Sequence, residues 1–137
     1  MMARLGGGLD MLRRRADFLA AKEGVKVGGP LVTLQLRDRQ ARDEAPRIGF
    51  TVTKRVGGAV ERNRMKRRLR AAARLALTDG ARSGFDYVLV ARRAVLDADF
   101  ERLKRDLAEA AKRAHGRAAS PDRKHRGAAG GRTESGQ

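Results

Sequence analysis

The feature that most constrains this chain is one long amphipathic helix rich in arginine. After Gly57 and Gly58, apolar residues return at helical spacing from Ala59 to about Leu77. The apolar stripe consists of Met65, Leu69, Ala72, Ala73 and Ala76. Because a helix with one apolar stripe has to bury it, the rest of the chain must supply a sheet or another helix for that stripe to pack against.

The other faces of this helix are strongly basic. The helix carries seven Lys and Arg residues against the single acid Glu61. Cations recur four residues apart at Arg62, Lys66, Arg70 and Arg74. Such like-charge pairs destabilise an isolated helix, so we expect a polyanion to neutralise them. The alternative is a solvated basic face, which the charge density disfavours because the other predicted helices mix their charges.

Composition indicates the same class of partner. The 137 residues include 32 Lys and Arg against 16 Asp and Glu, for a net charge of +16, which is typical of nucleic-acid-binding proteins. The chain has no Cys, so disulfides and thiolate metal sites are excluded. It has no apolar run of about 18 residues and no signal-peptide core near residue 1. We therefore expect a cytoplasmic protein with no membrane partner.

Hydrophobic periodicity predicts one domain over residues 10–115, between a flexible segment 1–9 and a disordered basic tail 116–137. The expected elements are a helix over 10–23, strands over 25–27, 31–37 and 47–54, the basic helix over 59–77, a strand over 85–92 and a helix that starts after Asp97 or Asp99. This α-β-β-β-α-β-α order indicates an α+β sandwich. The polar segment 38–46 is interpreted as a hairpin connection. The strands that flank the basic helix are expected to be parallel, and general rules favour a right-handed crossover between them.

The two faces of strand 47–54 differ in character. Ile48, Phe50 and Val52 occupy one face, which we expect to join the core. The opposite face carries Gly49, Thr51 and Thr53, whose small side chains suit the close approach of an extended backbone.

Phe18 has two open interpretations. It lies beside the predicted apolar stripe of the first helix, which consists of Leu12, Ala16, Leu19 and Ala20. The first interpretation is packing at the edge of the core, the usual fate of an aromatic ring. The second is a ring that stacks on an unpaired base.

The motifs around the basic helix resemble those of the bacterial ribonuclease P protein component. The core of the resemblance is Arg62-Asn63-Arg64 followed by Lys66-Arg67. The strand segments 47–52 and 86–92 and the helix segment 15–18 resemble the family in the same order, so the likeness covers residues 10–115. One position departs from the family pattern: where a second bulky residue is usual a turn after Phe18, this chain has Ala20-Ala21-Lys22.

The resemblance implies a fold like the second domain of ribosomal protein S5, a compact sandwich with a left-handed β-α-β crossover. It implies that the chain is the protein subunit of ribonuclease P, which removes 5′ leaders from precursor tRNA, with the catalytic centre and most of the bound Mg²⁺ on a catalytic RNA subunit. The expected partners are therefore ribonuclease P RNA and precursor tRNA, without DNA. The expected contacts to the RNA subunit are Lys54, Arg55, Arg62, Asn63, Arg64, Lys66, Arg67, Arg68 and Arg70. Those to the leader are Phe18, Thr51 and Thr53.

We expect the chain itself to carry no catalytic and no metal-binding residues. His115 and His125 lie at the end of the last helix and in the tail, which disfavours acid–base catalysis by histidine. Asp97 and Asp99 stand where a helix starts, and there caps are more common than metal ligands.

Two other functions compete with this interpretation. One is a structural RNA-binding protein of the ribosomal type, with no enzymatic association. The other is a DNA-binding protein with a recognition helix, which is disfavoured because strands, rather than a helix-turn-helix, flank the basic helix.

Overall fold

The computed structural model describes residues 4–6 and 8–119, and side chains from residue 8 onward. Six strands form one mixed sheet in the order β1-β2-β5-β6-β4-β3. The elements are β1 (Arg4–Gly6), β2 (Leu9–Met11), α1 (Arg15–Lys22), β3 (Val25–Gly28), β4 (Val32–Asp38), β5 (Arg47–Thr51), η1 (Lys54–Val56), α2 (Ala59–Ala76), β6 (Phe85–Ala91), η2 (Arg93–Leu96) and α3 (Phe100–Ala119). Among these described elements, no helix combines the length and the apolar character needed to span a membrane.

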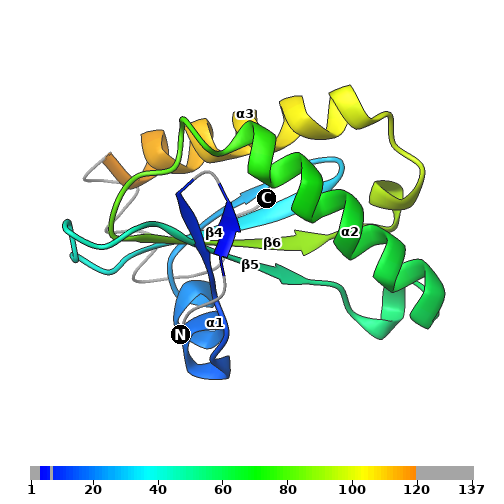
Figure 1. Ribbon diagram of the computed structural model, residues 1–137, viewed down its shortest axis with the longest axis horizontal. Coiled ribbons are helices and arrows are strands. Elements are labelled where there is room, and N and C mark those ends of the chain that lie inside the picture. Colours follow the sequence, from blue (N-terminus) through cyan, green and yellow to red (C-terminus); the bar gives the residue numbers. More distant parts are fainter. Residues whose placement is uncertain (1–3, 7, 120–137) are drawn as a thin grey trace.

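Helices cover both faces of the sheet. Figure 1 shows α2 and α3 side by side above it and α1 below. Strand β6 is central, parallel to β5 and antiparallel to β4. The predicted α+β sandwich and the parallel pairing around the basic helix are thus confirmed. The path from β5 through α2 to β6 turns in the left-handed sense, because β5 lies nearer the viewer than β6 in Figure 1 with α2 above both.

The main core fills the space between the sheet and the pair α2 and α3. The predicted stripe of α2 is confirmed, since Met65, Leu69, Ala72 and Ala73 are buried and Ala76 packs against them. α3 buries a stripe of its own, which consists of Leu103, Leu107, Ala110, Ala111 and Ala114. From the sheet, Ile48, Leu34 and Leu89 meet these helices. Each large side chain buried here contributes about 1.5–3 kcal/mol to stability.

A second, smaller apolar cluster lies between α1 and the opposite face of the sheet. It consists of Leu12, Ala21 and Val88, with Phe18 and Val90 packed against them. The first helix was therefore predicted with the wrong face inward: Ala21 is buried, whereas Leu19 is 44% exposed. α1 has only eight residues and begins at Arg15 rather than at residue 10, so Leu12, from which the predicted stripe was counted, lies before the helix.

The start of the chain also differs from expectation. Residues 10–12 were predicted as helix, but Leu9–Met11 form β2, which pairs in parallel with β5. Leu9 is 1% exposed, so part of the segment expected to be flexible belongs to the core. The reason is a short period-2 pattern, in which Leu9 and Met11 face the core on either side of Asp10.

Two further boundaries were predicted wrongly. Segment 38–46 is no hairpin, because β6 lies between β4 and β5. Helix α3 continues to Ala119, where the tail was expected to begin at Gly116. The last turn is held in place because Ala118 packs on the main core and Arg117 donates a hydrogen bond to the main-chain oxygen of Lys26. The remainder of the expected tail, 120–137, lies outside the described residues.

Candidate nucleic-acid interface

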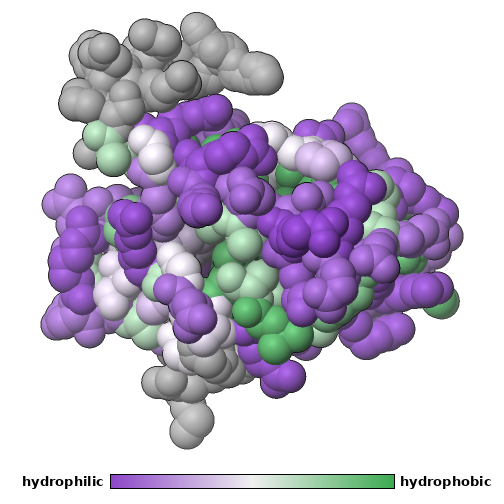
Figure 2. All heavy atoms as spheres, turned by 90° about the horizontal axis from the view of Figure 1, so that it is seen from above, coloured by the Kyte–Doolittle hydropathy of each residue, from purple (hydrophilic) through white to green (hydrophobic). Residues whose placement is uncertain are grey.

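The outer surface of α2 is a row of exposed cations. Seen from the side of the two long helices, the molecular surface is mostly hydrophilic, with a narrow apolar strip (Figure 2). Seven charged groups there make no hydrogen bond or ion pair with another described residue, and all seven residues are exposed. Five lie on α2, namely Arg64, Lys66, Arg67, Arg70 and Arg74, and the other two, Lys54 and Arg55, lie on η1 just before it. These cations are therefore available to an external anion.

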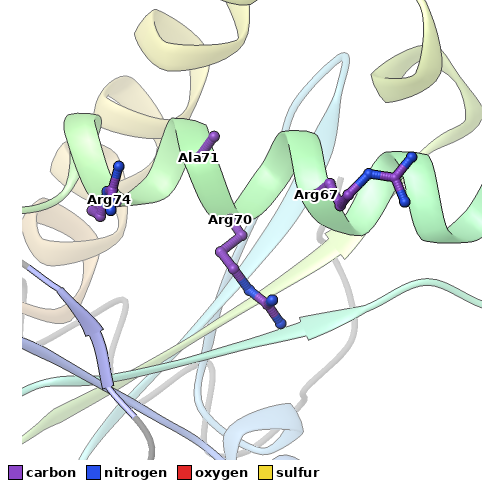
Figure 3. A pocket seen from close by; sticks show the side chains of 4 residues that line it. All are labelled: Arg67, Arg70, Ala71 and Arg74. Carbon is purple, nitrogen blue, oxygen red and sulfur yellow. The ribbon is translucent and has the colours of Figure 1, made fainter.

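The middle of this row is hollowed. Arg67, Arg70 and Arg74 surround Ala71, whose small side chain leaves a shallow depression between them (Figure 3). In the same view Arg70 extends from α2 toward the side on which β5 lies. Three guanidinium groups around a shallow site suit phosphates, because the planar fork of Arg binds such oxygens in pairs.

The turn that leads into α2 is fixed by hydrogen bonds and an ion pair. Glu61 accepts two hydrogen bonds of 2.7 Å from Arg93 and one of 3.3 Å from the backbone N–H of Gly58. The hydrogen bonds from Arg93 and Gly58 hold the pKa of Glu61 below its ordinary value. A side chain on Gly57 would meet Glu61 at 2.5 Å, so the close approach requires glycine. Glu61 thus already satisfies the backbone N–H of Gly58 at the N-terminus of α2.

Two expected RNA contacts point back into the protein. Arg68 donates hydrogen bonds to the main-chain oxygens of Val95 at 2.6 Å and Leu96 at 3.2 Å, and to that of Ala98. It therefore holds the loop after β6, and its role as an RNA contact stays a prediction. Arg62 is half-buried and donates through Nε to the oxygen of Gly57 at 3.1 Å. Arg62 and Arg68 lie one helical turn from the exposed Lys66 and Arg64. The sequence therefore gives no sign that the side chains of Arg62 and Arg68 bond to the protein itself.

The residues expected to meet the leader are Phe18 on α1, Thr51 on β5 and Thr53 just beyond the end of that strand. The ring of Phe18 lies directly on Gly49, since a Cβ at that glycine would sit 2.5 Å from the ring. Gly49 and Thr51 share this face of β5, and Thr53 follows beyond the end of the strand. Phe50 and Val52 pack against the main core on the other side, as predicted.

Phe18 combines features of both of its interpretations. It packs against Leu12, Ala21 and Val88, as expected for the edge of a core. It is only half-buried, so part of the side chain remains exposed. Base stacking needs such an exposed part.

A network of charged side chains underlies α1, and the sequence analysis missed it. Asp86 has no exposed surface and accepts two hydrogen bonds of 2.8 Å from Arg47. Arg39 Nε lies 2.9 Å from Asp86 Oδ1 without the angle of a hydrogen bond, and Arg37 lies 3.6 Å from Oδ2. The hydrogen bond to Asp86 raises the pKa of Arg47 above its ordinary value. The sign of this network in the sequence was Asp86, an acidic residue inside the otherwise apolar strand predicted over 85–92.

His115 lies inside the main core. Its Nε2 is 2.6 Å from the hydroxyl of Tyr87, which also accepts a hydrogen bond of 2.8 Å from the backbone N–H of Arg82. Burial lowers the pKa of His115 to about 4 and raises that of Tyr87 to about 12. Both side chains are therefore neutral at pH 7 and act as packed polar groups of the core.

Asp99 caps α3, as predicted for one of the two aspartates there. Its Oδ2 accepts a hydrogen bond of 3.2 Å from the backbone N–H of Arg102. Asp97 instead ends η2. Across residues 8–119, no three or more His, Asp or Glu side chains gather in a way that could hold a metal ion.

Sequence comparison finds the same family over nearly the whole described chain. The family model described as Ribonuclease P matches residues 9–115. The ribonuclease P protein component of Bartonella quintana is 50% identical over 94 residues, which cover 65% of this chain and 71% of that protein. The protein of the same name from Ruegeria pomeroyi is 46% identical over 110 residues, 79% of this chain and 88% of its own length.

Solved structures share the fold. The RNase P protein of Thermotoga maritima aligns with a TM-score of 0.64 at 28% identity, over 75% of this chain and 96% of that one. The RNase P protein of Staphylococcus aureus aligns with a TM-score of 0.63 at 25% identity, over 76% and 94%. The likeness therefore spans both helical layers and the sheet between them.

Proposed function

Since this chain belongs to the bacterial ribonuclease P protein family, we propose that it works in a holoenzyme in which a catalytic RNA cleaves precursor tRNA and this protein binds both. The observation that carries the proposal is the row of exposed cations on α2, none of which is neutralised by another described residue. These cations lie on one layer, and the ring of Phe18 lies on the opposite face of the sheet. Two separate RNA contacts therefore fit one small domain.

The catalytic RNA is the proposed partner of α2 and the turn before it. The proposed contacts are Lys54, Arg55, Asn63, Arg64, Lys66, Arg67 and Arg70, with Arg62 at the edge. Neutralising several phosphates releases counterions, so binding should weaken steeply as salt rises. Single-stranded and duplex DNA of equal length are the natural competitors for testing the preference for RNA.

The 5′ leader of precursor tRNA is the proposed ligand of the face that carries Phe18, Thr51 and Thr53. The leader is unpaired, so its bases can stack on an aromatic ring. Threonine hydroxyls donate and accept hydrogen bonds, and their small size lets a nucleotide chain approach the sheet.

Cleavage itself is proposed to take place on the RNA subunit, which would also hold most of the Mg²⁺. In phosphodiester hydrolysis, Mg²⁺ activates the attacking water and stabilises the leaving oxygen. The net charge of +16 favours phosphate over free metal ions near this protein. Its part is to hold the RNA subunit and the substrate together in the cytoplasm, where we place the holoenzyme.

The test is rescue of cleavage at low Mg²⁺. Ribonuclease P RNA and a precursor tRNA are mixed at a Mg²⁺ concentration where the RNA alone is nearly inactive, with and without the protein. We expect the protein to restore release of the 5′ leader at the mature end. A protein that binds the RNA tightly but leaves cleavage unchanged would instead fit a structural RNA-binding protein of the ribosomal type.

A further inference from the structure

Asp17 precedes Phe18 on α1 and connects that helix to the sheet. Its Oδ1 lies 3.4 Å from Arg47 Nη2 and 3.5 Å from Arg37 Nη1. Both guanidinium groups also reach Asp86, which is fully buried in β6. Asp17 is therefore the point at which a charged network inside the sheet holds α1.

The charges of this network explain why Asp17 is needed. The buried carboxylate of Asp86 faces the guanidinium groups of Arg37, Arg39 and Arg47. Arg39 has a second acidic partner, because it lies 2.5 Å from Glu44. The single negative charge of Asp86 cannot balance the positive charges of both Arg37 and Arg47. Asp17 on α1 supplies the second negative charge.

Besides these ion pairs, apolar packing against the sheet holds α1 in place. The helix has eight residues, a length at which an isolated helix is unstable in water. Its apolar contact is the small cluster around Ala21 and Val88. The ring of Phe18 rests on Gly49, which offers no side chain to hold the ring. The ion pairs of Asp17 therefore have a large share in setting the position of the ring.

We propose that Asp17 is a positioning residue for the leader: through Arg37 and Arg47 it sets α1 on the sheet so that the exposed part of Phe18 meets the first unpaired bases of precursor tRNA. The inference rests on the proposed function, since it takes Phe18 to be the residue that the leader touches. The carboxylate of Asp17, which by itself would repel RNA, would thus strengthen the binding of precursor tRNA.

The role of Asp17 can be tested by the direction in which its substitution changes RNA affinity. Asp17→Asn removes a negative charge, so electrostatics alone predicts equal or tighter binding of every RNA. Positioning predicts weaker binding of the precursor. Glu23→Gln is the matched control, because Glu23 directly follows α1, is exposed and has no charged partner among the described residues. It makes the same change of charge without touching the network.

The measurement is a set of dissociation constants for precursor and mature tRNA with the reconstituted holoenzyme. Asp17→Asn should weaken precursor binding by about three- to tenfold, less than removal of a stacked ring would, and leave mature tRNA binding within about twofold. Asp17→Ala should behave alike, and Glu23→Gln should match the wild type. In Phe18→Ala, adding Asp17→Asn should cause no further loss, because the ring that Asp17 positions is already gone.

The other possible outcomes distinguish the role of Asp17 from that of Phe18. If Phe18→Ala weakens precursor binding and Asp17→Asn does not, the positioning role fails while the leader site stands. If Phe18→Ala has no effect, the leader site at Phe18 fails and the role of Asp17 fails with it. Equal loss for both tRNAs, or additive loss in the double variant, means that Asp17 only stabilises the fold.

Discussion

Arg68 donates a hydrogen bond of 2.6 Å to the main-chain oxygen of Val95, and so ties the middle of α2 to the loop that follows β6. Its neighbour Arg67 is exposed and lines the hollow on the outer surface of the same helix. Two adjacent arginines therefore have different tasks, and the difference can be measured.

Arg68→Ala should lower the free energy of unfolding by about 1.5–3 kcal/mol, because the main-chain oxygens of Val95 and Leu96 lose a charged donor. Arg67→Ala should change it by less than about 0.5 kcal/mol. Urea denaturation of both variants provides the comparison. Equal stability of the two would mean that the contacts of Arg68 contribute nothing to the fold.

Arg67→Ala should instead weaken binding to the RNA subunit and reduce the slope of log affinity against log salt by about 1, the loss of one phosphate contact. Titrations at several salt concentrations give the slope, with Lys112→Ala on α3 as the control for one exposed cation elsewhere. An unchanged slope for Arg67→Ala would contradict the placement of α2 on RNA.

Gly49→Ala should disturb α1 although it adds a single methyl group. The new Cβ would lie 2.5 Å from the ring of Phe18 and 3.0 Å from Leu12, which forces the ring to move. We expect a loss of about 1–3 kcal/mol in stability. If the ring serves the leader, precursor binding should fall further than mature tRNA binding. A variant as stable as the wild type, with normal precursor binding, would show that the ring does not need this position.

Leu69→Ala tests the orientation of α2. Leu69 has no exposed surface, so its truncation should leave a cavity between helix and sheet and cost about 2–5 kcal/mol. Thermal denaturation with Leu75→Ala as the control is suitable, because Leu75 lies on the same helix but is exposed. A similar small effect of both changes would contradict the observed packing.

His115 should make stability depend on pH. Its pKa is lowered to about 4 in the folded protein, below the ordinary value of 6.5. The unfolded chain therefore takes up the proton first as pH falls, so the contribution of His115 is complete above pH 6.5 and is lost between about 6.5 and 4. The loss should reach up to about 3 kcal/mol. His115→Gln should flatten this part of the stability profile, and an unchanged profile would mean that His115 titrates normally.

Much of the sandwich followed from hydrophobic period alone. The stripe of α2 was predicted because Met65 and Leu69 recur at helical spacing, and the two faces of β5 because Ile48 and Phe50 alternate at strand spacing. The parallel pairing of β5 with β6 followed from the single helix between them.

The missed features depend on contacts between distant segments. Nothing near Asp10 indicates that β2 pairs with β5, whose partner residue Arg47 is far along the chain. Arg68 and Arg67 have the same chemistry, and only the position of the loop after β6 separates them. The network of Asp86 likewise joins four elements, α1, β4, β5 and β6, so no local pattern in the sequence indicates it.

The central place of β6 has a consequence for the order of events during synthesis. β6 is the last strand among the described residues, yet it lies between β4 and β5. Until residue 91 has left the ribosome, these two earlier strands have no common neighbour, and α2 has no complete surface for its apolar stripe. The sheet therefore closes late, as expected when long-range pairings dominate. During that interval the nascent chain presents an arginine-rich segment and unpaired strand edges together, the state in which it is most exposed to wrong partners.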